Sequence, residues 1–463
     1  MCGPKPYGSF FVYFAAFLGS FLTISYGFMF GMTPPTLLLY KSEYTPLSNG
    51  PLSNDSISWI TTYLCMGAAF GAVFFKHLSD CFGRRATLML AGIIQNLGWF
   101  GAAFGYNFTH ICISRLIVGL SGGCALTVLP LFLIEISKTK HIEGAYITTY
   151  IFQGFGIMFG YIFGTFADVI VTAIAGLVIS VLFSLCFPFV QESPYHYLKK
   201  NDMTMLEKSV RYFRAIRDLD QRSLPEFLAE VDKFRQNRKL MNGNSVPKKN
   251  GVENRVVYDD GSSPRKVKSF VSCLILVITS QLCGLLTILN YSSFIFGSVG
   301  SALPVYVSSI LLGAATFVGG LLSILIATCS WRKFIISAFS LLIGFCLATI
   351  GCFVYTEGWT VSSVDMNWVP LVCLVLYVLL TSASIYPMTF IVIAEVFSHK
   401  MADMVGSFYY LLHWVLGLLL IKFHFCIVDC IGLDIYFWIF SSFCIFQSVV
   451  LVFILPKKPQ RNL

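Results

Sequence analysis

Long apolar runs separated by short polar loops constrain this chain more than any other feature of its sequence. A helix needs about 20 apolar residues to cross a bilayer, and the chain offers about twelve such runs. Since the alternating pattern of a β-barrel is absent, we expect an all-α membrane protein with twelve transmembrane helices. The expected spans lie near residues 9–31, 58–77, 86–106, 110–134, 145–167, 168–190, 270–296, 303–327, 333–355, 368–394, 405–427 and 432–455.

The composition excludes a soluble domain. Hydrophobic residues make up 56% of the 463 residues, charged residues only 12%, and 44 residues are Phe. A soluble fold could not bury that much apolar surface, whereas a membrane protein turns it toward lipid. The first apolar run is too long for a signal peptide and no cleavage site follows it, so we interpret it as the first span.

Basic residues are concentrated in alternate loops, and the segment 194–268 alone holds seventeen of them. The positive-inside rule places that segment and both termini in the cytoplasm of a multi-pass protein, which we expect in the cell membrane. Asn54-Asp55-Ser56 then lies in the first outer loop. This tripeptide is an N-glycosylation signal, so Asn54 is a predicted glycosylation site.

The same basic segment divides the chain into two equal sets of spans. We expect a six-helix N-terminal half over 1–193, a cytoplasmic loop with short helices over 194–268, and a six-helix C-terminal half over 269–463. The loop is amphipathic and helix-prone up to about residue 239. Anionic lipid and topology control explain its basic character better than nucleic acid does.

Charged residues recur at corresponding inner ends of the two halves. The stretch LSDCFGRRATLML at Leu78–Leu90 has a counterpart in TCSWRKF at Thr328–Phe334. Likewise, Glu135 at the inner end of span 4 has a counterpart in Glu395 at the inner end of span 10. Such acids and bases can form ion pairs that close the inner mouth in one state and break in the other; alternatively, the Arg pair only marks an inner loop. The predicted inner-gate charges are Asp80, Arg84, Arg85, Glu135, Glu192, Arg332, Lys333 and Glu395.

Five motifs follow one another along nearly the whole chain. They are Asp80–Arg85 for D-x-x-G-R-R, Ser114–Gly119 for G-R-x-x-x-G with Ser for the first Gly, Pro130–Glu135 for P-x-Y-x-x-E with Phe for Tyr, Gln191–Pro194 for P-E-S-P with Gln for the first Pro, and Ser280–Gly284 for Q-Q-L-S-G with Ser for the first Gln. Together they resemble the sugar porter branch of the major facilitator superfamily. Within it the chain is most similar to insect facilitated trehalose transporters. The resemblance implies two six-helix halves that carry a sugar, such as trehalose or glucose, between them.

The resemblance also implies where the sugar binds, namely on spans 7, 10 and 11 and on a Gln of span 5. Amides suit sugar hydroxyls because both donate and accept hydrogen bonds, and a Trp face covers the apolar side of the ring. For Gln153 the alternative is an amide that joins two helices, and Gly156, Gly160 and Gly164 favour close packing along that span. The predicted substrate-binding residues are Gln153, Gln281, Ser280, Asn290, Tyr291, Phe390, His413 and Trp414.

Several positions depart from the sugar porter pattern. Leu286 stands where an Asn is usual, Phe390 where a Trp is usual, and His413 where an Asn precedes Trp414. Each lost amide leaves a sugar hydroxyl without a partner, which weakens binding. Two alternatives therefore stay open: a transporter-like nutrient sensor with little flux, and a transporter of a non-sugar small solute.

The first span contains no Asp or Glu between Ser9 and Gly31, although Arg115 is present in span 4. Proton-coupled sugar porters carry an acid there, so the resemblance implies facilitated diffusion instead. His413 is a second titratable candidate, although a lone His in a span is usually a packing residue. We find no nucleotide-binding loop, metal cluster or nucleophile arrangement, so we expect neither an enzyme nor a cofactor. The expected partners are a sugar and the lipid bilayer, with no nucleic acid, and the expected state is a monomer.

Overall fold

The structure is a computed structural model, and it describes residues 7–137, 142–214, 264–356, 366–396 and 399–454. Helices are the only regular elements in these ranges, and twelve of them are long and apolar enough to cross a membrane. This confirms the predicted all-α fold with twelve spans. The second part of the long loop, predicted to be polar and loose, falls outside the described ranges.

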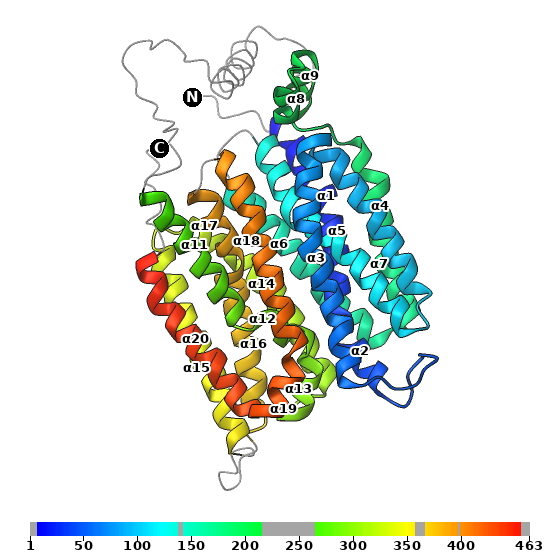
Figure 1. The fold of residues 1–463 in the computed structure, drawn as a ribbon, viewed down its shortest axis with the longest axis vertical. Coiled ribbons are helices and arrows are strands. Elements are labelled where there is room, and N and C mark those ends of the chain that lie inside the picture. The colour runs from blue at the N-terminus through cyan, green and yellow to red at the C-terminus, as the bar shows by residue number, and fades with distance from the viewer. Residues whose placement is uncertain (1–6, 138–141, 215–263, 357–365, 397–398, 455–463) are drawn as a thin grey trace.

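The N-terminal half contains the first six spans, and its helices lie on the right in Figure 1. The first span continues beyond its predicted end, because the helix restarts after Met32 and runs on to Lys41. Pro34 and Pro35 stand in the first turn of this added helix, where their missing N–H groups cost no hydrogen bond. The helices are α1 (Tyr7–Gly31), α2 (Thr33–Lys41), α3 (Asn54–Phe82), α4 (Arg84–Ala103), α5 (Phe108–Ile136), α6 (Ile142–Phe166) and α7 (Val169–Cys186).

The C-terminal half contains the other six spans, which lie on the left in Figure 1. Two of its spans are broken. The seventh is interrupted at Gly284, whose φ of 81° is accessible mainly to glycine, and the tenth is interrupted at Ser384. The helices are α11 (Pro264–Leu282), α12 (Leu285–Asn290), α13 (Ser292–Val299), α14 (Val305–Thr328), α15 (Arg332–Tyr355), α16 (Trp368–Ala383), α17 (Ile385–Val396), α18 (His399–Lys422), α19 (His424–Ile431) and α20 (Leu433–Ile454).

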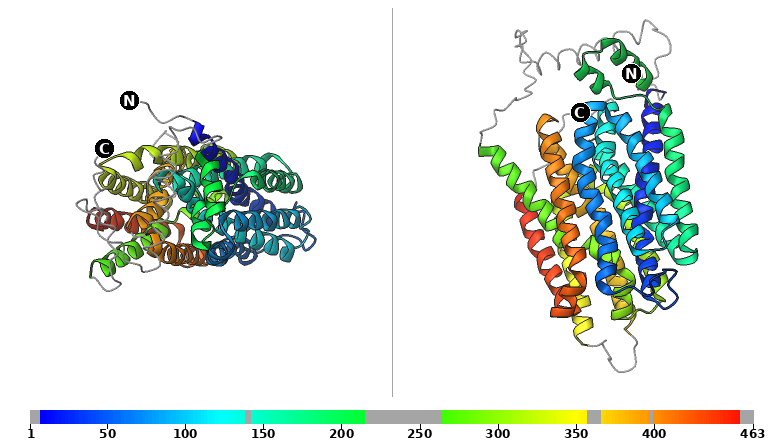
Figure 2. Two further views of the ribbon diagram at one scale, coloured as in Figure 1. Left: turned by 90° about the horizontal axis from the view of Figure 1, so that it is seen from above. Right: turned by 45° about the vertical axis from the view of Figure 1, so that its right-hand side comes forward.

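The two halves meet along two pairs of helices. α6 packs on α14 and α3 packs on α18, so each half contributes one helix to each contact. The view from above in Figure 2 shows the two halves side by side. Broken segments of spans 7 and 10 lie between these pairs, where irregular backbone is sheltered from lipid.

Close packing of α1 on α6 explains the glycine spacing of span 5. A Cβ at Gly156 would collide with the carbonyl oxygen of Ile24, and one at Gly160 with that of Phe28. Only glycine, whose side chain is a single hydrogen atom, allows the two backbones to approach so closely. The predicted packing role of these glycines is therefore confirmed.

Two short helices, α8 (Pro194–Lys200) and α9 (Met203–Arg214), cap one end of the bundle. They carry several basic residues, so we name this the basic end and the opposite one the α2 end. Ser209 Oγ donates to the backbone oxygen of Glu192 at 2.6 Å, and Arg214 donates to that of Ile136 at 2.9 Å. These bonds join the start of the predicted loop to the N-terminal half.

Candidate functional site

A cavity with an empty volume of about 510 Å³ lies between the two halves. α5 and α6 supply its wall from the N-terminal half, while α12, α17 and α18 supply the other wall. Both broken spans thus contribute to the cavity. The lining residues are Leu126, Pro130, Tyr146, Thr149, Tyr150, Gln153, Leu286, Tyr386, Pro387, Phe390, Tyr410, His413 and Trp414.

Four of the eight predicted substrate-binding residues line this cavity: Gln153, Phe390, His413 and Trp414. No described residue hydrogen-bonds to the Gln153 side chain, so its amide is available to a solute. Trp414 is 2% exposed, and its Nε1 is buried without a partner among the described residues. A buried N–H without a partner is costly, and a solute hydroxyl at this position would satisfy it.

Gln281 lies behind the cavity wall in a network with two other side chains. Its Nε2 is 2.6 Å from Nδ1 of His413 and 3.4 Å from the Tyr386 hydroxyl. The Tyr386 hydroxyl is in turn 3.1 Å from Nε2 of His413. The three residues stand on α11, α17 and α18. The network therefore fixes the segments of both broken spans that lie nearer the basic end against the eleventh span.

The remaining predicted substrate residues point elsewhere in this structure. Ser280 donates to the carbonyl of Val277 at 2.8 Å, and Asn290 donates to that of Leu286 at 2.7 Å. Both bonds stay within the seventh span. Tyr291 is 2.9 Å from Thr61 Oγ1 and donates to the carbonyl of Ile421 at 3.0 Å, so it bridges the halves at the α2 end.

Tyr386 and Tyr26 were not predicted as site residues. Tyr386 lines the cavity and contacts His413, while Tyr26 on α1 packs edge-on against Trp414 with 6.1 Å between ring centroids. The Tyr26 hydroxyl is buried without a partner among the described residues. The sequence did contain a signal for both residues, because each is a polar ring inside an apolar span. A buried Tyr O–H usually forms a hydrogen bond, so such a residue is a candidate site residue.

Contacts between the halves close the α2 end. Lys422 on α18 forms an ion pair with Asp55 on α3 at 2.5 Å, and its Nζ lies 4.2 Å from the Trp59 ring centroid. The Tyr161 hydroxyl also donates to the carbonyl of Leu289 at 2.7 Å. With this end closed, the cavity occupies the part of the interface nearer the basic end.

In the N-terminal half, the predicted charges form one cluster at the basic end. Arg84 pairs with Asp80 at 2.7 Å and with Glu135 at 3.1 Å. Gly83 has a φ of 105°, and a Cβ there would collide with the Glu192 carboxylate. That carboxylate accepts from the backbone N–H groups of Arg84 and Arg85 at 2.9 and 3.0 Å, so it caps α4 where the helix dipole favours an anion.

His196 on α8 lies against this cluster, outside the membrane-spanning segments. Burial lowers its pKa, while the neighbouring Glu192 carboxylate acts in the opposite direction. Arg85 differs from the other predicted gate residues of this half, because its guanidinium donates to the carbonyl of Pro188 at 2.6 Å. Among the described residues it forms no ion pair.

The C-terminal half repeats the arrangement in a simpler form. Arg332 binds Glu395 through two nitrogens, one of them Nη1 at 2.9 Å from Oε1. Arg332 also lies 3.8 Å from Glu143 at the start of α6, which was not predicted and belongs to the other half. Lys333 instead lies over the Phe334 ring, 4.8 Å from its centroid. Arg332 thus joins the halves at the basic end.

Known proteins resemble the chain over almost its whole length. The facilitated trehalose transporter Tret1 of Bombyx mori is 23% identical over 97% of this chain and 85% of its own length. The Drosophila virilis protein of the same name is 20% identical over 94% of this chain, which spans only 46% of that longer relative.

Solved structures show the same fold. A structure of the proton:xylose symporter XylE bound to 6-bromo-6-deoxy-D-glucose has a TM-score of 0.70 at 17% identity, covering 97% of each chain. A partially occluded, inward open structure of XylE from E. coli has a TM-score of 0.72 at 15% identity, covering 96% of this chain and 100% of that one. The architecture is therefore the major facilitator fold. Because the model of the family described as sugar (and other) transporter matches residues 8–463, the chain belongs to that family of membrane transporters.

Proposed function

We propose that this protein carries a sugar across the cell membrane by facilitated diffusion. The observation that carries the proposal is the cavity between the halves, which Gln153 and Trp414 both line while the α2 end is closed. Alternating access needs one site between two bodies that close at one end at a time. Trehalose and glucose are the first candidates, because relatives named trehalose transporters resemble the whole chain.

The basic end faces the cytoplasm in this proposal, together with both termini. The structure then corresponds to a state that opens inward. To open outward, the halves must separate at Asp55–Lys422 and Thr61–Tyr291. The halves must also draw together at the basic end, where Arg332 and Glu143 already lie 3.8 Å apart. We assign the charges around Arg84 and Arg332 to that closure, and Asn54 to glycosylation on the outer side.

Passive transport is supported by the surroundings of Arg115. Its Nη1 donates to Thr33 at 2.9 Å, and within the described residues it forms no ion pair. His413 is bonded to Gln281 and Tyr386 rather than to a carboxylate. Within the part of the chain that the structure describes, neither residue faces an acid, so these two positions offer no pair there that could exchange a proton during transport.

The test is uptake of labelled trehalose and glucose into oocytes that express the chain, with Gln281→Ala beside it. Removal of Gln281 leaves His413 and Tyr386 without their shared partner, so uptake should fall. Saturable uptake that falls in the variant would support the proposal. Surface-expressed protein without uptake of either sugar would contradict it; sugar binding without uptake would then indicate a sensor.

A second function has support from the cavity wall. Leu286 and Phe390 replace two polar positions of the family pattern, and both line the cavity. A less polar, non-sugar solute would leave fewer hydroxyl groups unpaired against such a wall. Uptake of a solute of this kind that neither sugar inhibits would favour this alternative.

A further inference from the structure

The cavity between the halves changes character along its length. Gln153, His413 and Trp414 lie at its deep part, near the middle of their helices. Tyr146 precedes Gln153 by two helical turns, or about 10 Å, toward the basic end. Tyr410 precedes Trp414 by one turn, about 6 Å, in the same direction.

Aromatic and aliphatic groups form the part of the cavity toward the basic end. Phe390 and Tyr410 stack face to face, with ring centroids 3.9 Å apart and planes 9° apart. Pro130 and Tyr146 face them from the other half. The Thr149 hydroxyl donates to the carbonyl of Ala145 at 2.9 Å, so it is already engaged.

A free sugar carries hydroxyls around its whole ring and would match only the deep part of this cavity. Hydroxyls placed against the ring faces of Phe390 and Tyr410, away from the Tyr410 O–H, would lose water without gaining partners. Aromatic walls instead favour a flat apolar group, which can stack on them.

We propose that the preferred solute is a glycoside, with its sugar at Gln153 and Trp414 and an apolar aglycone between Tyr146 and the Phe390–Tyr410 stack. This inference rests on the proposed sugar transport and narrows its substrate class. The aglycone points toward the basic end, away from the contacts that close the α2 end.

The experiment measures binding to the purified full-length chain in lipid nanodiscs by calorimetry, with glucose and phenyl glucoside as probes. Phenyl glucoside should bind at least about threefold more tightly than glucose, since one aromatic contact is worth about that factor or more. Phe390→Ala should remove most of this advantage and change glucose affinity less. The matched control is Phe345→Ala, because that ring is 57% exposed on the outer face of α15.

A second variant keeps the inference testable if Phe390→Ala fails to fold. Leu286→Asn adds an amide at the deep part of the cavity, where the sugar of both probes lies, so it should strengthen the binding of glucose and of phenyl glucoside by similar factors of about threefold or more. Stronger binding of glucose alone would overturn the inference. The inference would be overturned if both probes bound with equal affinity, or if neither bound to folded protein. It would also be overturned if Phe390→Ala weakened the binding of both probes equally. Glucose uptake without preference for the glycoside would leave the proposed transport intact; glycoside preference without any uptake would overturn transport alone.

Discussion

Gln153 is the residue whose side chain most directly links this structure to sugar binding. Its amide faces the cavity from α6, and no described residue bonds to it. We expect Gln153→Ala to raise the KM for sugar uptake about threefold to tenfold, since one hydrogen bond contributes about 0.5–1.5 kcal/mol. Uptake kinetics, corrected for surface expression, provide the measurement.

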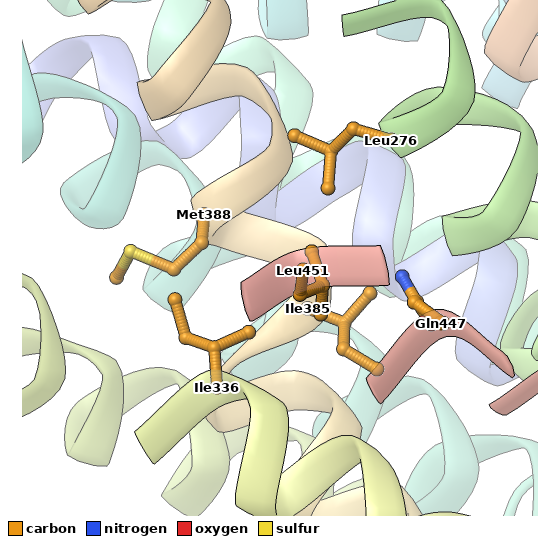
Figure 3. Close-up of a pocket in the computed structure, with 6 residues that line it drawn as sticks. All are labelled: Leu276, Ile336, Ile385, Met388, Gln447 and Leu451. Carbon is orange, nitrogen blue, oxygen red and sulfur yellow. The ribbon is translucent and has the colours of Figure 1, made fainter. Parts of the chain in front are cut away.

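Gln447→Ala is the matched control for that substitution. Gln447 lies in a separate cavity of the C-terminal half, with an empty volume of about 200 Å³ and otherwise apolar walls (Figure 3). Its Nε2 is buried without a partner among the described residues. Its truncation should therefore leave the KM nearly unchanged, and equal effects of the two variants would contradict the assignment of Gln153.

The Glu192 carboxylate stabilises the basic end of the N-terminal half. It accepts backbone N–H groups at the start of α4, including those of Arg84 and Arg85. Because bonds to a charged group contribute about 1.5–3 kcal/mol, Glu192→Ala should lower the unfolding temperature of the detergent-solubilised protein. Glu43→Ala, which removes an exposed carboxylate, should not. An unchanged unfolding temperature in Glu192→Ala would contradict the capping role.

Sequence patterns located the helices that line the cavity better than they located the contacts within it. Gln153 and Trp414 occupy expected positions, but Gln281 is bonded to His413 and Tyr386 behind the wall. A motif fixes which residue type stands on which span. It does not fix which buried polar groups satisfy one another, because partners such as Tyr386 are more than 100 residues away and are chosen by tertiary packing.

The contact between α1 and α6 depends on small residues, as does the contact between α3 and α5. A Cβ at Gly156 would collide with the backbone of α1. Since a backbone atom cannot move aside as a side chain can, Gly156→Val should sharply reduce the yield of folded protein, measured as the monodisperse fraction in size-exclusion chromatography.

Gly297→Val provides the comparison, because no atom lies within 4 Å of a Cβ built there on α13. Its yield should match that of the unmodified chain. Equal yields of the two variants would show that the α1–α6 contact tolerates separation.

The continuity of each helix was harder to predict than its existence. Apolar runs indicate that a segment crosses the bilayer, and all twelve spans were found where such runs occur. Gly284 gave a local signal for the break in the seventh span, whereas Ser384 gave almost none in the tenth. Hydropathy counts apolar side chains and carries no information on backbone hydrogen bonds, so it cannot distinguish a broken span from a straight one.

At the scale of the whole molecule, contacts between halves decide which end is closed. Lys422→Ala removes the ion pair with Asp55 at the α2 end. An exposed pair contributes about 0.2–1 kcal/mol, so up to about fivefold more molecules should open there. Backbone hydrogen exchange in α12 and the first turns of α3 should rise accordingly.

The charge-reversed double variant Asp55→Lys with Lys422→Asp restores the pair in the opposite sense. It should bring hydrogen exchange back toward that of the unmodified chain. If Lys422→Ala leaves exchange unchanged, the ion pair does not hold the α2 end closed.

Reconstituted protein shows whether sugar crosses the membrane without energy coupling. We would measure uptake of labelled glucose and trehalose into proteoliposomes, with and without an imposed proton gradient. Facilitated diffusion predicts saturable uptake of at least one sugar that stops at equal concentrations inside and outside and is unaffected by the gradient. Accumulation driven by the gradient, or no uptake of either sugar by folded protein, would contradict it.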